Sequence, residues 1–276
     1  MASLAKMRWG VIPLIHITHR TAAQNGVSRF PGCLASSTTP LGGKCLGSKR
    51  EASTSTKQPV NLGASIASKL SLDGKVTVVT GGTRGVGLTL AERLASVAKW
   101  HFSILWSLSV TAAGLALDKP FLEYGWEESR RILDINFIGS FFSAQLAARQ
   151  MVQQGTGGSI VMISSMAGHC AIPSQRVSMY GASKAAIKLL GKSLGVEMAP
   201  HNIRVNTLSP GYIENETTGS LSELEEIVNR IPPMGRIGQP DDLSMAVAYL
   251  LSEGASYTTG TDIPVTGGLH NGRIEL

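Results

Sequence analysis

Apolar and polar positions along residues 72–276 follow two alternating patterns, one typical of buried strands and one of amphipathic helices. Short runs rich in β-branched and other apolar residues predict strands at 75–80, 107–111, 159–164, 203–208 and 261–265. Longer stretches with apolar residues at helical spacing predict helices at 85–98, 126–154, 178–198 and 241–252. Strands that alternate with helices are typical of the α/β class, in which a parallel sheet lies between helices.

Length and charge divide the chain into two parts. With 276 residues, 43% of them hydrophobic, the chain can bury one sizeable core, so we expect one folded domain at 72–276 after a leader at 1–60. Residues 1–70 hold nine Lys or Arg but one acid, Glu51, whereas residues 71–276 hold sixteen basic and eighteen acidic residues. The net charge of +6 therefore belongs to the leader, and it does not indicate a nucleic-acid-binding domain.

The leader is rich in Ser, Thr, Ala and Gly, contains several Arg residues and almost lacks acids. This composition is typical of a transit peptide and predicts a mitochondrial protein. One alternative is a secretory signal on the apolar run at 9–17, although Pro13 and His16 interrupt that run. The other is a disordered extension of a cytoplasmic protein. No part of the chain has the roughly 18 consecutive apolar residues that a membrane-spanning helix needs.

The cysteines do not indicate a metal site or a disulfide framework. Cys33, Cys45 and Cys170 are too few and too scattered for either, so we expect no bound metal. Cys170 follows His169, but adjacent residues on an extended segment point to opposite sides. We therefore do not expect these two side chains to form a nucleophile pair.

Tyr180 and Lys184 stand four residues apart in a predicted helix, so their side chains share one face. A tyrosine with a pKa of about 10 is a poor acid–base catalyst at neutral pH, and a fixed neighbouring cation favours its phenolate. The pair therefore predicts a proton-transfer device. Taken alone, the same spacing also fits an exposed pair without function.

A glycine-rich turn joins the predicted strand at 75–80 to the predicted helix at 85–98. Gly81, Gly85 and Gly87 allow a tight turn there, and they let a pyrophosphate approach the amides at the start of the helix. The alternative is a tight turn that binds nothing. Position directly after a strand favours nucleotide binding.

Six features follow one another along the chain: Thr-Gly-x-x-x-Gly-x-Gly at 80–87, Asn136 within a helix, Ser165 at a strand end, Tyr180-x-x-x-Lys184, Asn-x-x-Ser-Pro-Gly at 206–211 and Gly-Gly at 267–268. In this order they resemble the short-chain dehydrogenase/reductase family, from about residue 72 to residue 268. The resemblance implies a Rossmann-like doubly wound parallel sheet, a nicotinamide cofactor and hydride transfer to or from a carbonyl carbon.

The resemblance also implies catalytic roles for four residues. Tyr180 donates a proton to the carbonyl oxygen, or accepts one in the reverse direction. Lys184 holds down the pKa of that tyrosine and binds the nicotinamide ribose. Ser165 polarises the same oxygen, and we prefer it to Ser164 because it begins the loop. Asn136 anchors a water that relays protons to the lysine.

The cofactor-binding residues are likewise implied by the resemblance. They comprise the glycine turn, the catalytic pair and a segment beside the nicotinamide: Gly81, Arg84, Gly85, Val86, Gly87, Tyr180, Lys184, Pro210, Gly211, Ile213 and Thr217. Arg84 stands near the expected adenosine 2′ position, so NADP(H) is the predicted cofactor. If Arg84 is simply a solvated arginine, NAD is the alternative.

The chain departs from the family pattern after the first predicted helix. The family has a second strand, a further helix and a third strand before the strand that ends here near Gly114, and such a unit needs upwards of about 30 residues. There is no room for it near 98–105, and no acid lies between Glu92 and Asp118 to bind the adenosine ribose. Thr111 also replaces the family's usual Asn.

This departure predicts a sheet that lacks one edge and much of the adenine pocket, with strand 75–80 exposed at the side. Three explanations fit: a truncated gene model or splice variant, a degenerate protein without activity, or an enzyme whose leader or partner subunit fills the gap. The first is favoured because each catalytic position downstream is present.

The residues around 112–123 and 209–213 are similar to those of fungal-type polyol dehydrogenases and ketose reductases, which implies a carbonyl reductase or alcohol dehydrogenase. A 3-oxoacyl-carrier-protein reductase is the alternative enzyme, and a non-catalytic subunit is the alternative of another class. We expect loops 166–178 and 212–235 to select the small-molecule substrate. The resemblance also implies a homodimer or homotetramer that pairs helices 126–154 and 178–199. We expect neither a nucleic-acid partner nor a membrane span.

Overall fold

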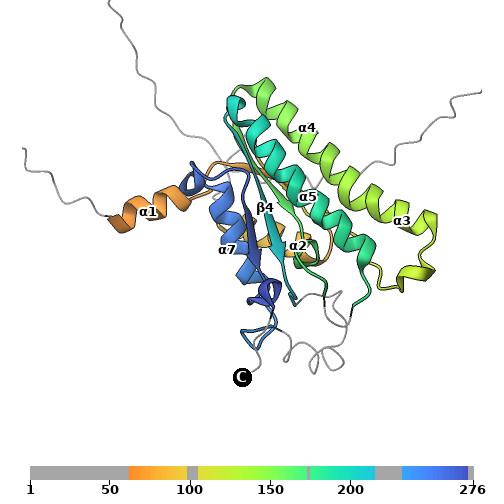
Figure 1. The fold of residues 1–276 in the computed structure, drawn as a ribbon. Coiled ribbons are helices and arrows are strands. Elements are labelled where there is room, and N and C mark those ends of the chain that lie inside the picture. Colours follow the sequence, from red (N-terminus) through yellow and green to blue (C-terminus); the bar gives the residue numbers. More distant parts are fainter. Residues whose placement is uncertain (1–61, 98–104, 173–174, 215–231, 273–276) are drawn as a thin grey trace, which may run out of the picture. The chain divides into compact units, whose positions relative to one another are not determined.

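The computed structural model describes residues 62–97, 105–172, 175–214 and 232–272, all within one compact unit that spans residues 57–276 (Figure 1). Its centre is a five-stranded parallel sheet in the order β1-β2-β3-β4-β5. The strands are β1 (Val76–Thr80), β2 (Trp106–Thr111), β3 (Gly158–Ile163), β4 (Ile203–Pro210) and β5 (Asp262–Val265). The predicted α/β class with a parallel sheet is confirmed.

Helices connect the strands. The α-helices are α1 (Leu62–Leu70), α2 (Gly85–Val97), α3 (Trp126–Leu133), α4 (Gly139–Gln154), α5 (Ser178–Glu197) and α7 (Pro240–Leu251). Short 3₁₀ turns are η1 (Phe121–Glu123), η3 (Met166–Gly168), η4 (Ala199–His201), η5 (Glu253–Ala255) and η6 (Leu269–Asn271). α1 begins before residue 72, where we expected the folded domain to start. No helix in the described ranges combines the length and the apolar character needed to cross a membrane.

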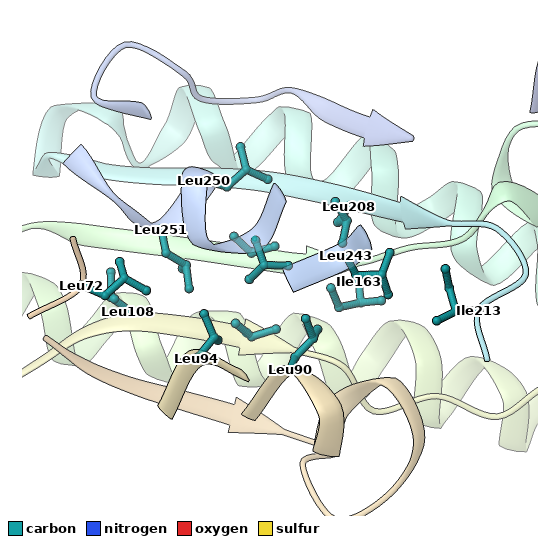
Figure 2. Packing of buried hydrophobic residues seen from close by; sticks show 13 residues of the cluster. Leu72, Leu90, Leu94, Leu108, Ile163, Leu208, Ile213, Leu243, Leu250 and Leu251 are labelled. Atoms are coloured by element: carbon teal, nitrogen blue, oxygen red, sulfur yellow. The ribbon is translucent and has the colours of Figure 1, made fainter. Parts of the chain in front are cut away.

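Two hydrophobic clusters fix the helices on opposite faces of the sheet. On one face, α2 and α7 contribute Leu90, Leu94, Leu243 and Val247 to a cluster with Val110 and other strand residues (Figure 2). On the other face, α4 and α5 pack against the alternate residues of the same strands, in a cluster that includes Met151 and Ile187. Figure 1 shows α4 and α5 together on the side away from α7. Successive side chains of a strand point to opposite faces, so a strand covered by helices on both sides contributes apolar residues to both clusters in turn.

The helix predicted at 126–154 contains an irregular turn. α3 and α4 are joined by η2 (Asp134–Ile138), one turn of π-helix, whose hydrogen bonds join residues five apart and which therefore holds one extra residue. The apolar spacing on both sides is helical, so the sequence pattern did not distinguish this turn. The turn contains Asn136, which is fully buried and bonds the Leu115 backbone and Ser183.

β1 lies at the end of the sheet, as the short connection to the next strand predicted. Within the described residues it pairs with β2 alone, and all five of its residues are half-buried. The composition of strand 75–80 is typical of a strand buried on both faces, but the missing neighbour leaves it partly exposed, as the short connection led us to expect. Charged residues, prolines and bulges usually protect an edge strand from pairing with another chain. Residues 77–80 contain only Val and Thr and have none of these features.

A charge on the open part of β1 should suppress self-association. Val78 belongs to neither hydrophobic cluster, whereas Val79 packs against the cluster formed with α2 and α7. We expect Val78→Lys to lower aggregation on heating with a small loss of stability, and Val79→Lys to unfold the protein more readily. Light scattering together with thermal unfolding measures both effects. Equal aggregation of Val78→Lys and wild type would show that the β1 edge is already protected.

Candidate active site

Polar side chains gather beyond the carboxyl end of the sheet, where β1 to β4 end in parallel register. Thr80 pairs with Thr111, Thr111 with Met162, and Met162 with Thr207. The loops that follow these four strands therefore leave the sheet at the same end, with β4 continuing three residues further to Pro210. The first two turns of α5 lie next to these loops and carry Tyr180 and Lys184.

Lys184 is buried in this region, with 3% of its surface exposed. Its Nζ donates a hydrogen bond of 2.9 Å to the carbonyl of Ile163, the last residue of β3. Ser164 Oγ donates to the backbone carbonyl of Lys184 at 2.8 Å, so the strand end holds both ends of this residue. Burial lowers the pKa of Lys184 from 10.5 to about 8, because desolvation disfavours its charged form.

Asn136 joins three parts of the site through its side-chain amide. Its Nδ2 donates to the Leu115 carbonyl and to Ser183 Oγ, each at 2.9 Å, and its Oδ1 accepts from the Leu115 amide at 2.7 Å. The loop after β2 is thereby tied to α5. A Cβ at Gly114 would lie 3.4 Å from Lys184 Nζ and 3.6 Å from Asn136 Oδ1, so the bare glycine keeps this space open.

Tyr180 lies beside Lys184, whose Nζ is 5.7 Å from the centroid of the phenol ring. Burial raises the pKa of Tyr180 above its ordinary value, and a side-chain hydrogen bond with Ser165 acts in the opposite direction. The pKa of Tyr180 is therefore not lowered overall, as the neighbouring Lys184 was expected to lower it, because desolvation outweighs the opposing effect. The phenol is therefore protonated near neutral pH.

Ser165 occupies the start of the loop after β3. It caps η3, since its Oγ accepts a hydrogen bond of 3.2 Å from the Ala167 amide. Ser164, by contrast, uses its hydroxyl on the carbonyl of Lys184. The turn that Ser165 begins packs on the first turns of α5, where a Cβ on Gly181 would lie 2.8 Å from the Ala167 carbonyl, and of the two serines Ser165 is the one that lowers the pKa of Tyr180.

The glycine turn after β1 packs closely on the loop after β2. Gly81 has a positive φ of 73°, and a Cβ there would lie 2.5 Å from the backbone nitrogen of Ala113. A Cβ on Gly87, in the first turn of α2, would overlap the Gly81 carbonyl. Gly85 begins α2 with a φ of 54°. These contacts admit only glycine without a shift of backbone.

The remaining predicted cofactor residues flank this region. Arg84 is exposed just before α2 and makes no ion pair with another described residue, while Val86 is partly buried against the α2–α7 cluster. Pro210 ends β4, and the Gly211 amide donates to the Val265 carbonyl at 2.8 Å. Ile213 turns its side chain into the core, at 5% exposure. Thr217 lies outside the described residues.

Sequence reasoning missed two residues that help to build the site. Ser183 Oγ accepts from Asn136 and donates to the Tyr180 carbonyl at 2.7 Å, and Gly114 leaves space beside Lys184. Ser183 stands three residues after Tyr180, on nearly the same helical face, and this spacing was the available signal. Thr111 was noted only as a departure from the family pattern. Its Oγ1 is the one buried side-chain polar atom without a hydrogen-bond partner in the described ranges.

His169 and Cys170 do not face each other. His169 Nε2 lies 2.8 Å from Asp262 Oδ2, whereas Cys170 Sγ lies 3.8 Å from the Met166 carbonyl. This agrees with the expectation from their adjacent positions. No group of three or more potential metal-ligating side chains occurs within the residues that the structure describes.

Comparison with known proteins identifies the family. A family model described as enoyl-(acyl carrier protein) reductase matches residues 91–270. The chain belongs to the short-chain dehydrogenase/reductase family. Among solved structures, a short-chain dehydrogenase/reductase from Mycobacterium marinum is similar, with a TM-score of 0.67 and 32% identity over 74% of this chain and 98% of that chain.

The relatives carry several activities. D-arabinitol 2-dehydrogenase (ribulose-forming) from Candida albicans is 39% identical over 61% of this chain, which spans 62% of that relative. The 3-oxoacyl-[acyl-carrier-protein] reductase FabG from Aquifex aeolicus is 32% identical over 73% of this chain and 99% of its own length. An NADP-dependent (R)-specific alcohol dehydrogenase from Lentilactobacillus kefiri is 30% identical over 71% of this chain and 97% of its own length. Relatives at this level establish an oxidoreductase but not its substrate.

The Aquifex alignment also shows a difference in length. It occupies 249 positions and nearly the whole relative, yet it uses only 73% of the 276 residues of this chain. Part of the relative therefore has no counterpart here.

Replacement of Lys184 should stabilise the fold at neutral pH. Its pKa is lowered in the folded state, so below about pH 8 folding carries the cost of a buried charge, and this cost disappears as pH rises from about 8 to 10.5. We expect Lys184→Met to be more stable than wild type by up to about 3 kcal/mol at pH 7, with a smaller difference at pH 9.5. Urea unfolding at both values measures this, with Lys192→Met, an exposed lysine of α5, as control. A gain that does not depend on pH would contradict the assigned cause.

Proposed function

We propose that this chain is an NADP(H)-dependent oxidoreductase that interconverts a carbonyl and a secondary alcohol, with ketose or polyol substrates favoured. The observation that carries this proposal is the convergence of Asn136, Ser165, Tyr180 and Lys184 at the carboxyl end of the sheet. These residues come from three separate elements: Asn136 from η2, Ser165 from the start of η3, and Tyr180 with Lys184 from α5. Their contacts join a proton donor, a second hydroxyl and a buried cation.

The donor set fits the nicotinamide half of the cofactor. Lys184 Nζ uses one hydrogen bond on Ile163 and has further N–H groups to offer, which suits a ribose diol. At the glycine turn, the first backbone hydrogen bond of the helix start runs from the Leu88 amide to the Arg84 carbonyl. The preceding amides are therefore available to a pyrophosphate, together with the positive end of the 13-residue helix α2.

When bound, the cofactor supplies or accepts the hydride at the substrate carbon. Tyr180, protonated near neutral pH, gives its phenolic proton to the carbonyl oxygen, and the Ser165 hydroxyl holds that oxygen in place. The charge of Lys184 stabilises the phenolate that remains. Asn136 holds the loop after β2 and α5 together around these groups. The phenol, protonated near neutral pH, is in the form that carbonyl reduction requires of a proton donor.

The substrate class rests on similarity. Relatives named as a D-arabinitol 2-dehydrogenase and a sorbose reductase support a ketose or polyol. FabG supports an acyl-carrier-protein substrate as the alternative. Consumption of NADPH with a panel of ketoses and acyl thioesters distinguishes the two. A non-catalytic subunit would consume NADPH with none of them.

Mitochondrial import and oligomerisation are further parts of the proposal. The acid-poor composition of the leader supports import, and a fluorescent fusion of residues 1–60 that stayed diffuse in the cytosol would contradict it. Large apolar side chains stand exposed along α3, α4 and α5, namely Trp126, Phe142, Leu146, Leu189 and Val196. Their exposure supports a homodimer or homotetramer, which light scattering after size exclusion detects.

Tyr180→Phe should abolish reduction while cofactor binding stays nearly unchanged, because the substitution removes only the transferable proton. We expect kcat/KM to fall by roughly 10² to 10⁴. Tyr257→Phe, at a fully exposed tyrosine, is the control. Steady-state kinetics and NADPH titration measure both quantities. If Tyr180→Phe retained most of kcat, the assigned proton donor would be wrong.

The cofactor should bind weakly. Among the described residues no strand lies on the outer side of β1 that could form the adenosine pocket. We expect affinity for NADPH on the order of a thousandfold below that of a full-length relative. Arg84→Ala should weaken NADPH by about a further tenfold and leave NADH unchanged, since it removes a charge for the 2′-phosphate. Calorimetric titration with both cofactors measures this. Micromolar NADPH affinity in wild type would show that another segment replaces the missing wall.

A further inference from the structure

A buried carboxylate lies at the start of β5, on the face of the sheet that α5 covers. The side chain of Asp262 is only 7% exposed. Thr207 Oγ1 donates to its Oδ1 at 2.5 Å, and Ser209 Oγ lies 2.9 Å from Oδ1 and 3.0 Å from Oδ2. Both donors belong to β4, the strand that continues into Pro210 and Gly211. Asp262 is therefore fixed to the strand that leads to the cofactor region.

His169 completes this set of donors from another element. Its Nε2 lies 2.8 Å from Asp262 Oδ2, and because a carboxylate only accepts hydrogen bonds, the ring donates. His169 follows η3 directly, and its backbone amide donates to the Met166 carbonyl at 2.8 Å. The other end of η3 is Ser165, whose Oγ accepts from the Ala167 amide. The imidazole and the Ser165 hydroxyl thus stand at the two ends of one short turn.

Other ionisable groups lie around Asp262, but among the described residues His169 is the only ionisable side chain within 4.0 Å of its carboxylate. Lys188 of α5 donates to the Gly168 carbonyl at 3.2 Å. His270 of η6 lies near His169, with ring centroids 5.5 Å apart, and its Nδ1 is 2.7 Å from Thr266 Oγ1. Lys192 and Cys170 are further neighbours of Lys188. A buried carboxylate held by specific donors resists displacement, because any move leaves it unpaired.

We propose that the Asp262–His169 contact is a positioning device that holds the turn bearing Ser165, so that the Ser165 hydroxyl meets the phenol of Tyr180. This inference rests on the proposed function, in which those two hydroxyls act on one carbonyl oxygen. In this proposal His169 acts by holding Ser165 in position, and it does not contact the substrate. A rigid turn matters here because small displacements of a catalytic group are costly in rate.

Titration of Tyr180 tests the link without any turnover. The Ser165 hydrogen bond lowers the pKa of Tyr180, so loss of the correct Ser165 position raises it. Fluorotyrosine, whose phenol is more acidic than that of tyrosine, brings the titration below alkaline unfolding, and ¹⁹F NMR resolves the ring that Tyr180→Phe deletes. We expect His169→Leu to shift this pKa upward, in the same direction as Ser165→Ala. In the double variant that carries both substitutions, the pKa of Tyr180 should equal that in Ser165→Ala alone.

Two matched variants separate this effect from a general loss of structure. His169→Gln retains an N–H group near the position of Nε2 and should restore the wild-type titration. His270→Leu removes a neighbouring imidazole that does not bond Asp262, and should leave the titration unchanged. An unchanged titration in His169→Leu, with a shifted one in Ser165→Ala, overturns the positioning role. An unchanged titration in Ser165→Ala overturns both that role and the assigned Ser165–Tyr180 pair.

Kinetics provide the second measurement once a substrate is found. We expect His169→Leu to lower kcat about tenfold and to leave the KM for NADPH unchanged, because the turn lies away from the glycine loop. His169→Gln should recover most of kcat. A rise in the NADPH KM with kcat unchanged would contradict the proposal. Absence of turnover in wild type would instead contradict the proposed function, while the NMR titration still decides the role of His169.

Discussion

The burial of one ammonium group, that of Lys184, is the constraint on which the site depends. An amine with 3% exposure tolerates its charge only if surrounding groups replace water, and the Ile163 carbonyl does so directly. The bonds of Ser164 to Lys184 and of Asn136 to Ser183 then fix the helix that carries the amine. The same burial that makes this residue unfavourable for folding makes its charge effective beside Tyr180.

Much of the fold was predictable because strand and helix periods differ. The strand ending in Ser164 and the helix containing Tyr180 were located within a residue or two, since buried runs of Ile and Val end abruptly at polar residues. The α/β class followed from the alternation of strands and helices, whereas the family and the predicted catalytic quartet rested on motif order. The structure brings the members of that quartet together, although their chemical roles are still predictions.

The remaining features arise from contacts between distant residues. The π-turn at Asn136 has no distinctive spacing, because one extra residue hardly alters an apolar stripe. The pKa of Tyr180 depends on how deeply α5 is seated, which the Tyr-Lys spacing does not encode. β1 has the composition of a strand covered on both faces, yet its half-buried state results from what lies beside it in the sheet. Asp262 and His169 are 93 residues apart and neither belongs to a motif.

The consecutive strand order has a consequence for the handedness of the chain. Each connection steps to the next strand in the same direction, but α2 and α7 cross one face of the sheet while α4 and α5 cross the other. The two pairs of βαβ units are therefore of opposite hand, and about 98% of such crossovers are right-handed. Two units must adopt the rare left-handed form. Packing of the helices on the sheet has to hold those two units against the preference of the local chain geometry.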